Sequence, residues 1–111
     1  MQQADVLAKK EFTDNGVNKV TYLKTDAIAQ DTYYFKPGQV LDYHRHPNGD
    51  QIFFVQEGEG TAFVDEGKEE SIALKPGVVL LAPKGVWHKV VAKTNLVLSQ
   101  ATCQPAGMEK R

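Results

Sequence analysis

The chain has 111 residues, of which 41% are hydrophobic and 24% are charged, and its formal net charge is −1. This length and composition fit one globular domain, which we take to span residues 1–111. The balanced charge argues against a nucleic-acid partner, and no apolar run approaches the about 20 residues that cross a bilayer. Residues 1–12 lack the layout of a secretory signal, so we expect a cytoplasmic protein that does not bind membranes.

Short runs rich in β-branched and aromatic residues follow one another along the chain, and Gly and Pro separate them. They predict strands over residues 19–23, 31–35, 51–56, 60–64, 69–71, 78–81, 88–91 and 96–102. Many short strands with regular turns indicate an all-β sandwich or barrel, and no long segment has the 3.6-residue period of a helix. We expect residues 1–15 to form an N-terminal arm or strand and residues 107–111 to form a loose tail.

Two of the three histidines lie at positions i and i+2, as His44 and His46. On a strand such side chains share one face, with Cα atoms about 7 Å apart, so both imidazoles can reach one ion. A turn at residues 47–49 then allows Gln51 to lie on the neighbouring strand. Alone, a His-x-His pair is more often an exposed surface feature, and a lone His88 is more often structural. The spacing around these residues favours a metal site.

Two segments carry a resemblance to the cupin superfamily. Residues 38–58 contain glycine, five residues, His-x-His, four residues, Gln51, six residues and glycine. Residues 77–88 contain glycine, five residues, Pro-x-Gly, two residues and His88. Both segments resemble the two cupin motifs without a gap. The resemblance, to small single-domain cupins of the RmlC-like type 2 group, implies an antiparallel jelly-roll β-barrel (a double-stranded β-helix) with little helix. It also implies a metal inside the barrel and a homodimer.

The implied ligands are three imidazoles and one amide oxygen, from His44, His46, Gln51 and His88. Cupins usually carry Glu where this chain has Gln51, and Asn where it has Ala92. Because the amide is neutral, a bound divalent ion (Fe, Mn, Ni or Zn) keeps its full charge and acts as a stronger Lewis acid. We therefore expect a metal-dependent isomerase, lyase or hydrolase that acts on a small anionic, oxygen-rich substrate such as a sugar acid or keto acid.

Two alternatives remain open at this stage. One is that the protein is an oxygen-dependent dioxygenase. The other is that it is a non-catalytic module that senses a ligand or uses the metal structurally. The His-x-His, Gln and distant His also resemble the short cupins that help to open unsaturated uronate sugars. That group carries an Asp near its last strand, whereas residues 98–104 contain no carboxylate.

Strand alternation nominates neighbours of the predicted ligands. Asp42 shares the face of His44 and is a candidate general base, although a solvated rim residue is the simpler interpretation. Candidate substrate-pocket residues are Phe53, Val55, Val90 and Gln100. The apolar members of this set are more often core residues than substrate contacts.

Overall fold

A computed structural model describes all residues 1–111 and contains ten strands and no helix. The strands are β1 (Asn18–Lys24), β2 (Ile28–Phe35), β3 (Val40–Arg45), β4 (Gln51–Glu57), β5 (Gly60–Asp65), β6 (Glu69–Leu74), β7 (Val79–Ala82), β8 (Trp87–Ala92), β9 (Leu96–Cys103) and β10 (Glu109–Lys110). The predicted all-β class is confirmed. No segment forms a helix of the length and apolarity that a membrane span needs.

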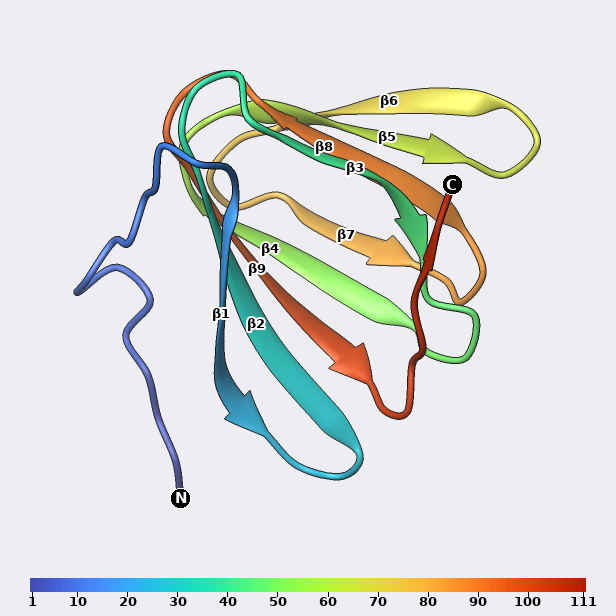
Figure 1. Cartoon of the computed structure of the whole chain (residues 1–111), viewed down its shortest axis with the longest axis horizontal. Helices are drawn as coiled ribbons and strands as arrows, with labels where there is room; N and C mark the ends of the chain where they lie inside the picture. The colour runs from blue at the N-terminus through green and yellow to red at the C-terminus, as the bar shows by residue number, and fades with distance from the viewer.

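The strands form two five-stranded antiparallel sheets that face each other (Figure 1). One sheet has the order β1-β2-β9-β4-β7 and the other has the order β10-β3-β8-β5-β6. Strands adjacent in each sheet are mostly distant in sequence, so the chain crosses repeatedly between the sheets. This arrangement confirms the expected jelly roll.

The core lies between the sheets, where alternate side chains of each strand point inward. Strand β4 illustrates the alternation, because Gln51, Phe53 and Val55 are buried while Ile52 and Phe54 are exposed. Eleven buried hydrophobic residues form one apolar cluster, which includes Phe35, Leu96 and Leu98. The interior therefore combines this apolar cluster with buried polar side chains, among them His44, Gln51 and His88.

A glycine closes the corner between β4 and β5. Gly58 has a φ of 87°, and a Cβ at this position would lie 1.8 Å from the main-chain oxygen of Asn95. Only glycine fits this approach, because an L side chain would be both strained and in collision. The bend at Gly58 therefore sets the path of the chain at this corner.

The two chain ends differ from each other. Residues 1–15 form an arm without a strand, and the arm packs on Tyr34, whose hydroxyl donates to the Val6 carbonyl at 2.7 Å. The C-terminal residues were expected to be loose, but Glu109 and Lys110 form β10 and pair with Arg45 and His44 of β3. The reason is that β3 would otherwise be an edge strand with free main-chain groups, which the tail satisfies.

Candidate metal centre

Neighbouring strands β3 and β8 bring His44 and His88 together. The two residues are direct cross-strand partners, and both side chains point into the barrel, with 7% and 4% of their surface exposed. Their ring centroids lie 4.3 Å apart. A pair that is far apart in sequence thus meets because of the antiparallel register.

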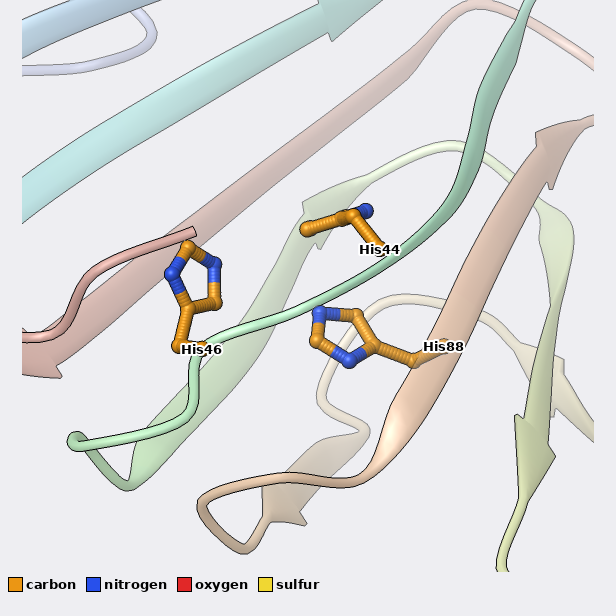
Figure 2. Close-up of side chains that lie close together, drawn as sticks. All are labelled: His44, His46 and His88. Carbon is orange, nitrogen blue, oxygen red and sulfur yellow. The ribbon is translucent and has the colours of Figure 1, made fainter. Parts of the chain in front are cut away.

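His46 completes the cluster from the position directly after β3. Its ring centroid lies 5.4 Å from that of His44 and 6.0 Å from that of His88. One ligand nitrogen from each ring lies within 4.8 Å of the others, and the three rings converge (Figure 2). Two nitrogens that share an ion at about 2.1 Å lie up to about 4 Å apart, so separations within 4.8 Å are close to those of a metal site.

The same ring atom, Nδ1, forms a hydrogen bond in all three histidines. Each Nδ1 donates to a main-chain carbonyl, at 2.8 Å for His44 to Asp42, 2.6 Å for His46 to Gly107 and 3.0 Å for His88 to Val86. A carbonyl only accepts, so Nδ1 carries a proton, and in the tautomer that this fixes the lone pair is on Nε2. The Nε2 atoms of His46 and His88 are buried and have no hydrogen-bond partner. Three free lone pairs in this arrangement fit a divalent cation.

Burial keeps two of these rings neutral. It lowers the pKa of His88 to about 4, with the nearby His44 contributing, and it lowers the pKa of His44 from its ordinary value. A water-poor environment penalises the charged imidazolium, and a second cation nearby adds to that penalty. Near neutral pH both rings are therefore in the form that binds a metal.

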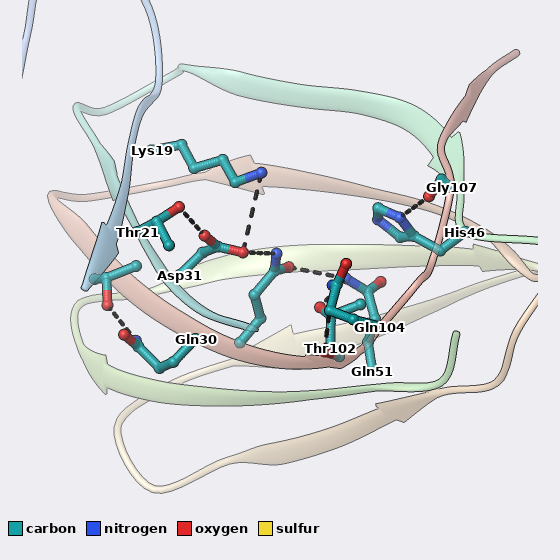
Figure 3. Close-up of polar contacts among 11 residues, drawn as sticks. Lys19, Thr21, Gln30, Asp31, His46, Gln51, Thr102, Gln104 and Gly107 are labelled. Carbon is teal, nitrogen blue, oxygen red and sulfur yellow. Dashed lines mark hydrogen bonds and ion pairs between the residues drawn. The ribbon is translucent and has the colours of Figure 1, made fainter. Parts of the chain in front are cut away.

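Gln51 stands on β4, in the opposite sheet, and only 1% of its surface is exposed. Its Nε2 donates to Gln100 Oε1 at 3.1 Å and to Thr102 Oγ1 at 2.9 Å (Figure 3). Both amide hydrogens are thereby used, whereas its Oε1 is buried without a partner. An unpartnered buried oxygen is costly unless something binds it, so this atom also fits a cation.

A cavity of about 540 Å³ opens beside His44 and His46. It is lined by Val17, Lys19, Tyr33, Leu41, Asp42, Tyr43, His44, His46, Met108, Lys110 and Arg111. Three of these residues are cationic and one is acidic. Arg111 pairs with Asp65 at 2.8 Å, whereas Lys110 forms no ion pair. The cavity therefore presents a net positive charge to whatever enters it.

The other sequence-predicted residues lie in different places. Asp42 is exposed and lines the cavity, where its carboxylate accepts from the main-chain nitrogen of Tyr43. Phe53, Val55 and Val90 belong to the apolar core and do not line this cavity, although the Phe53 ring lies 5.6 Å from that of His88. Gln100 contacts Gln51 and not the cavity.

Sequence reasoning missed three parts of this site: the cations of the cavity, the C-terminal segment and Asp31. Lys19, Lys110 and Arg111 are ordinary surface residues in the sequence, and only the fold collects them. Asp31 is 5% exposed and accepts from Gln100 at 3.0 Å. A signal existed for it, because strand alternation places Asp31 on the inner face with Tyr33 and Phe35.

Comparison with known proteins decides the family. The sequence profile described as Cupin domain matches residues 32–99, which include every residue of the histidine cluster. The chain belongs to this cupin family. The three histidines are thus a possible metal site of a cupin, with the fold and the motifs that the sequence analysis expected.

Similar solved structures extend the likeness to nearly the whole cupin chain. An RmlC-like cupin protein from Desulfovibrio desulfuricans has a TM-score of 0.85 and 27% identity, covering 93% of this chain and 96% of its own. KdgF from Halomonas sp. has a TM-score of 0.73 and 23% identity, covering 81% and 80%. A recombinant oxalate oxidase in complex with glycolate has a TM-score of 0.77 and 21% identity, covering 97% and 62%. The last two similarities concern the fold alone.

Among curated relatives, the uncharacterized protein YdbB of Bacillus subtilis is 33% identical over 73 residues, which cover 63% of each chain. The chain spans between 34% and 63% of the length of the curated relatives that it matches. These relatives therefore support the domain and not the activity of a whole protein.

Proposed function

We propose that this cupin is a metal-dependent enzyme that acts on a small anionic, oxygen-rich substrate such as a sugar acid or keto acid. His44, His46, His88 and Gln51 would hold one divalent transition metal ion. The observation that carries the proposal is the convergence of three imidazoles with their Nδ1 atoms tied and their Nε2 lone pairs free. This cluster lies at the edge of a cationic cavity.

The chemistry of the donor set favours Lewis-acid catalysis. When bound, the ion would polarise a carbonyl or hydroxyl oxygen of the substrate, because three neutral imidazoles and an amide leave its charge uncompensated. An anionic substrate then supplies the charge that the protein ligands lack. Isomerisation, elimination and hydrolysis of hydroxy or keto acids all use such polarisation.

The charges of the cavity support an anionic substrate. Lys110 carries a free ammonium group, and the Lys19 ammonium lies 3.9 Å from Asp31, where it remains about half exposed. Either group can meet a carboxylate near the histidine cluster. Asp42 lines the same cavity and is the one acidic residue among the lining residues. We therefore propose it as the proton acceptor.

The first test measures the metal. Protein purified without added metal is analysed for its elements, as wild type, as His46→Ala and as the control Arg45→Ala. We expect about one equivalent of transition metal in the wild type and in the control, and a loss of at least tenfold in His46→Ala. Equal metal content in all three would remove the proposed site.

The second test concerns the substrate class. With Mn²⁺ in the site, glycolate should displace bound water and change the relaxation rate of solvent protons, whereas neutral ethylene glycol should not. Lys110→Gln should weaken glycolate binding severalfold without changing Mn²⁺ affinity. Turnover of hydroxy and keto acids that persists under argon supports the Lewis-acid class, whereas oxygen uptake with the same acids identifies a dioxygenase instead. A ligand that binds tightly and leaves unchanged identifies a sensing module.

We also propose that the protein works in the cytoplasm as a homodimer. The support for the dimer is an exposed apolar patch on strands β4 and β7, formed by Ile52, Phe54, Val79 and Leu81. Cell fractionation tests the location.

A further inference from the structure

A line of buried polar side chains runs across the inner face of one sheet, from Asp31 on β2 through Gln100 on β9 to Gln51 on β4. Asp31 and Gln100 are direct cross-strand partners, and Gln51 is the cross-strand partner of Thr102. The three side chains are 5%, 2% and 1% exposed. Polar groups buried to this degree persist only when their hydrogen bonds are satisfied.

The hydrogen bonds join these residues end to end, and Figure 3 labels the two ends of this line, Asp31 and Gln51. Gln100 Nε2 donates to Asp31 Oδ2 at 3.0 Å, and Gln51 Nε2 donates to Gln100 Oε1 at 3.1 Å. The other carboxylate oxygen of Asp31 accepts from the Thr21 hydroxyl, and the Lys19 ammonium lies 3.9 Å from Oδ2. Asp31 therefore anchors one end of the line, and the unpartnered oxygen of Gln51 is the other end.

The anchor imposes a direction on the line. A carboxylate only accepts hydrogen bonds, whereas an amide donates at its nitrogen and accepts at its oxygen. Facing Asp31, Gln100 must present its nitrogen, so its oxygen is turned toward Gln51. Gln51 must then present its own nitrogen to that oxygen. Reversing either amide would bring two acceptors together without a proton between them, at a cost of a buried unsatisfied group.

We propose that Asp31 is a positioning residue that acts through Gln100 to keep the Gln51 amide oxygen, and not its nitrogen, available to the metal. This inference rests on the proposed metal site. An amide nitrogen has no lone pair for a cation, so the orientation decides whether Gln51 is a ligand at all. Asp31 does not line the cavity, which separates this role from that of a residue in contact with substrate.

The test is a double-mutant cycle on metal affinity. Metal-free protein is titrated with Co²⁺, and the dissociation constant and the visible absorption of the bound ion are measured. Asp31→Asn removes the acceptor-only anchor and keeps the shape of the side chain. We expect a dissociation constant roughly 10–100-fold higher and an altered cobalt spectrum, as for loss of groups that orient metal ligands. Gln51→Ala should weaken binding to a similar extent.

The decisive comparison is the double variant. If Asp31 acts through Gln51, Asp31→Asn changes the affinity little in the Gln51→Ala background, and the spectra of the two Gln51→Ala proteins coincide. The control is Ser99→Ala, which removes a buried bond to Thr32 between the same strands at the adjacent register position. We expect the control to leave cobalt affinity within about twofold, even where it lowers thermal stability.

Each contrary result has its own meaning. An equal loss from Asp31→Asn in both backgrounds overturns the positioning role and indicates a general charge or folding effect. No loss from Gln51→Ala in a protein that still binds Co²⁺ overturns the role of Gln51 and leaves the histidine cluster intact. A wild type that binds no Co²⁺ overturns the metal site itself.

A measurement on the wild type covers the case in which Asp31→Asn does not fold. In isotope-labelled metal-free protein, the side-chain amide protons of Gln51 should show nuclear Overhauser contacts to Thr102, whose hydroxyl accepts from Gln51 at 2.9 Å. Amide protons of Gln51 that contact the imidazole rings instead would overturn the proposed orientation.

Discussion

At the scale of single residues, the histidines are distinguished by what their second nitrogen does. All three Nδ1 atoms donate to main-chain carbonyls, and two of these carbonyls belong to residues two positions earlier, Asp42 and Val86. The chain just before His44 and His88 thus fixes the orientation of each of these two rings. His46 obtains the same bond from Gly107, which is 61 positions away. These three hydrogen bonds therefore fix the orientation of the rings in the donor set.

The metal-free protein should lose stability in mildly acidic solution. An unfolded histidine titrates at about 6.5, whereas burial lowers the pKa of folded His88 to about 4 and that of His44 in the same direction. Between these values the unfolded state binds more protons, so the free energy of unfolding falls as the pH drops from about 6.5 to about 4. Urea unfolding across this range measures the slope. His88→Gln should flatten it, and an unchanged slope in that variant would contradict the assignment.

Gln51→Glu separates the needs of the metal from those of the fold. The new carboxylate cannot donate to Gln100, so without metal we expect the free energy of unfolding to fall by about 1–3 kcal/mol. A bound cation should restore much of the lost free energy of unfolding, because it attracts the added negative charge. Urea unfolding with and without Mn²⁺ tests both statements. The control is Gln104→Glu, at a half-buried position directly after β9. Its free energy of unfolding should not respond to metal.

At the scale of elements, the C-terminal segment is part of the site. Strand β10 pairs with β3, and residues 107–111 supply the carbonyl that orients His46 together with Met108, Lys110 and Arg111 of the cavity wall. Arg111 is held over the Tyr43 ring at 4.7 Å and paired with Asp65. A short strand thus joins the orientation of a metal ligand to the charge of the cavity.

Deletion of residues 107–111 should therefore weaken both metal binding and the binding of an anion in the cavity. We expect metal affinity to fall about 10–100-fold, because His46 loses the acceptor that holds its ring. Glycolate binding to the Mn²⁺-loaded protein should weaken further, because two cations are lost. Both affinities are measured by titration. Glu109→Gln removes only the ion pair with Arg45 and should leave them unchanged. A deletion variant with the metal affinity of the wild type would contradict this role.

At the scale of the whole molecule, one outer surface is unusually apolar. Ile52 and Phe54 of β4 are 40% and 41% exposed, and their cross-strand partners on β7, Leu81 and Val79, are 65% and 58% exposed. The four side chains form a continuous apolar patch beside the edge strand β7. A patch of this kind on a sheet edge invites contact with another surface.

We expect this apolar patch to be the interface of a homodimer. The double variant Phe54→Lys and Leu81→Lys should shift the protein from dimer to monomer at micromolar concentration, because it places charges in an apolar contact. Light scattering coupled to gel filtration measures the mass. Val40→Lys, at an exposed apolar position on the other sheet, is the control. A wild type that is monomeric at high concentration would contradict the prediction.

Much of the fold was predictable because its determinants are local. Period-two alternation and the turns around Gly38, Gly58 and Gly85 indicate strands wherever they occur, and the predicted strands lie within or close to the observed ones. The spacing of His44, His46 and His88 within the two motifs likewise pointed to one cluster. These signals act over a few residues, so a single sequence contains them.

The remaining features depend on which strands become neighbours. Asp31 meets Gln100 across 69 positions, and Gly107 meets His46 across 61, through an antiparallel register that no local pattern encodes. For the same reason Phe53, Val55 and Val90 joined the core, while Lys19, Lys110 and Arg111 gathered around the cavity. The sequence alone determined which side chains share a face of a strand, because the alternation of side chains is local. The partners of each buried polar group follow only from the pairing of distant strands, because the register between two strands is set when their buried faces and turns come together in the fold.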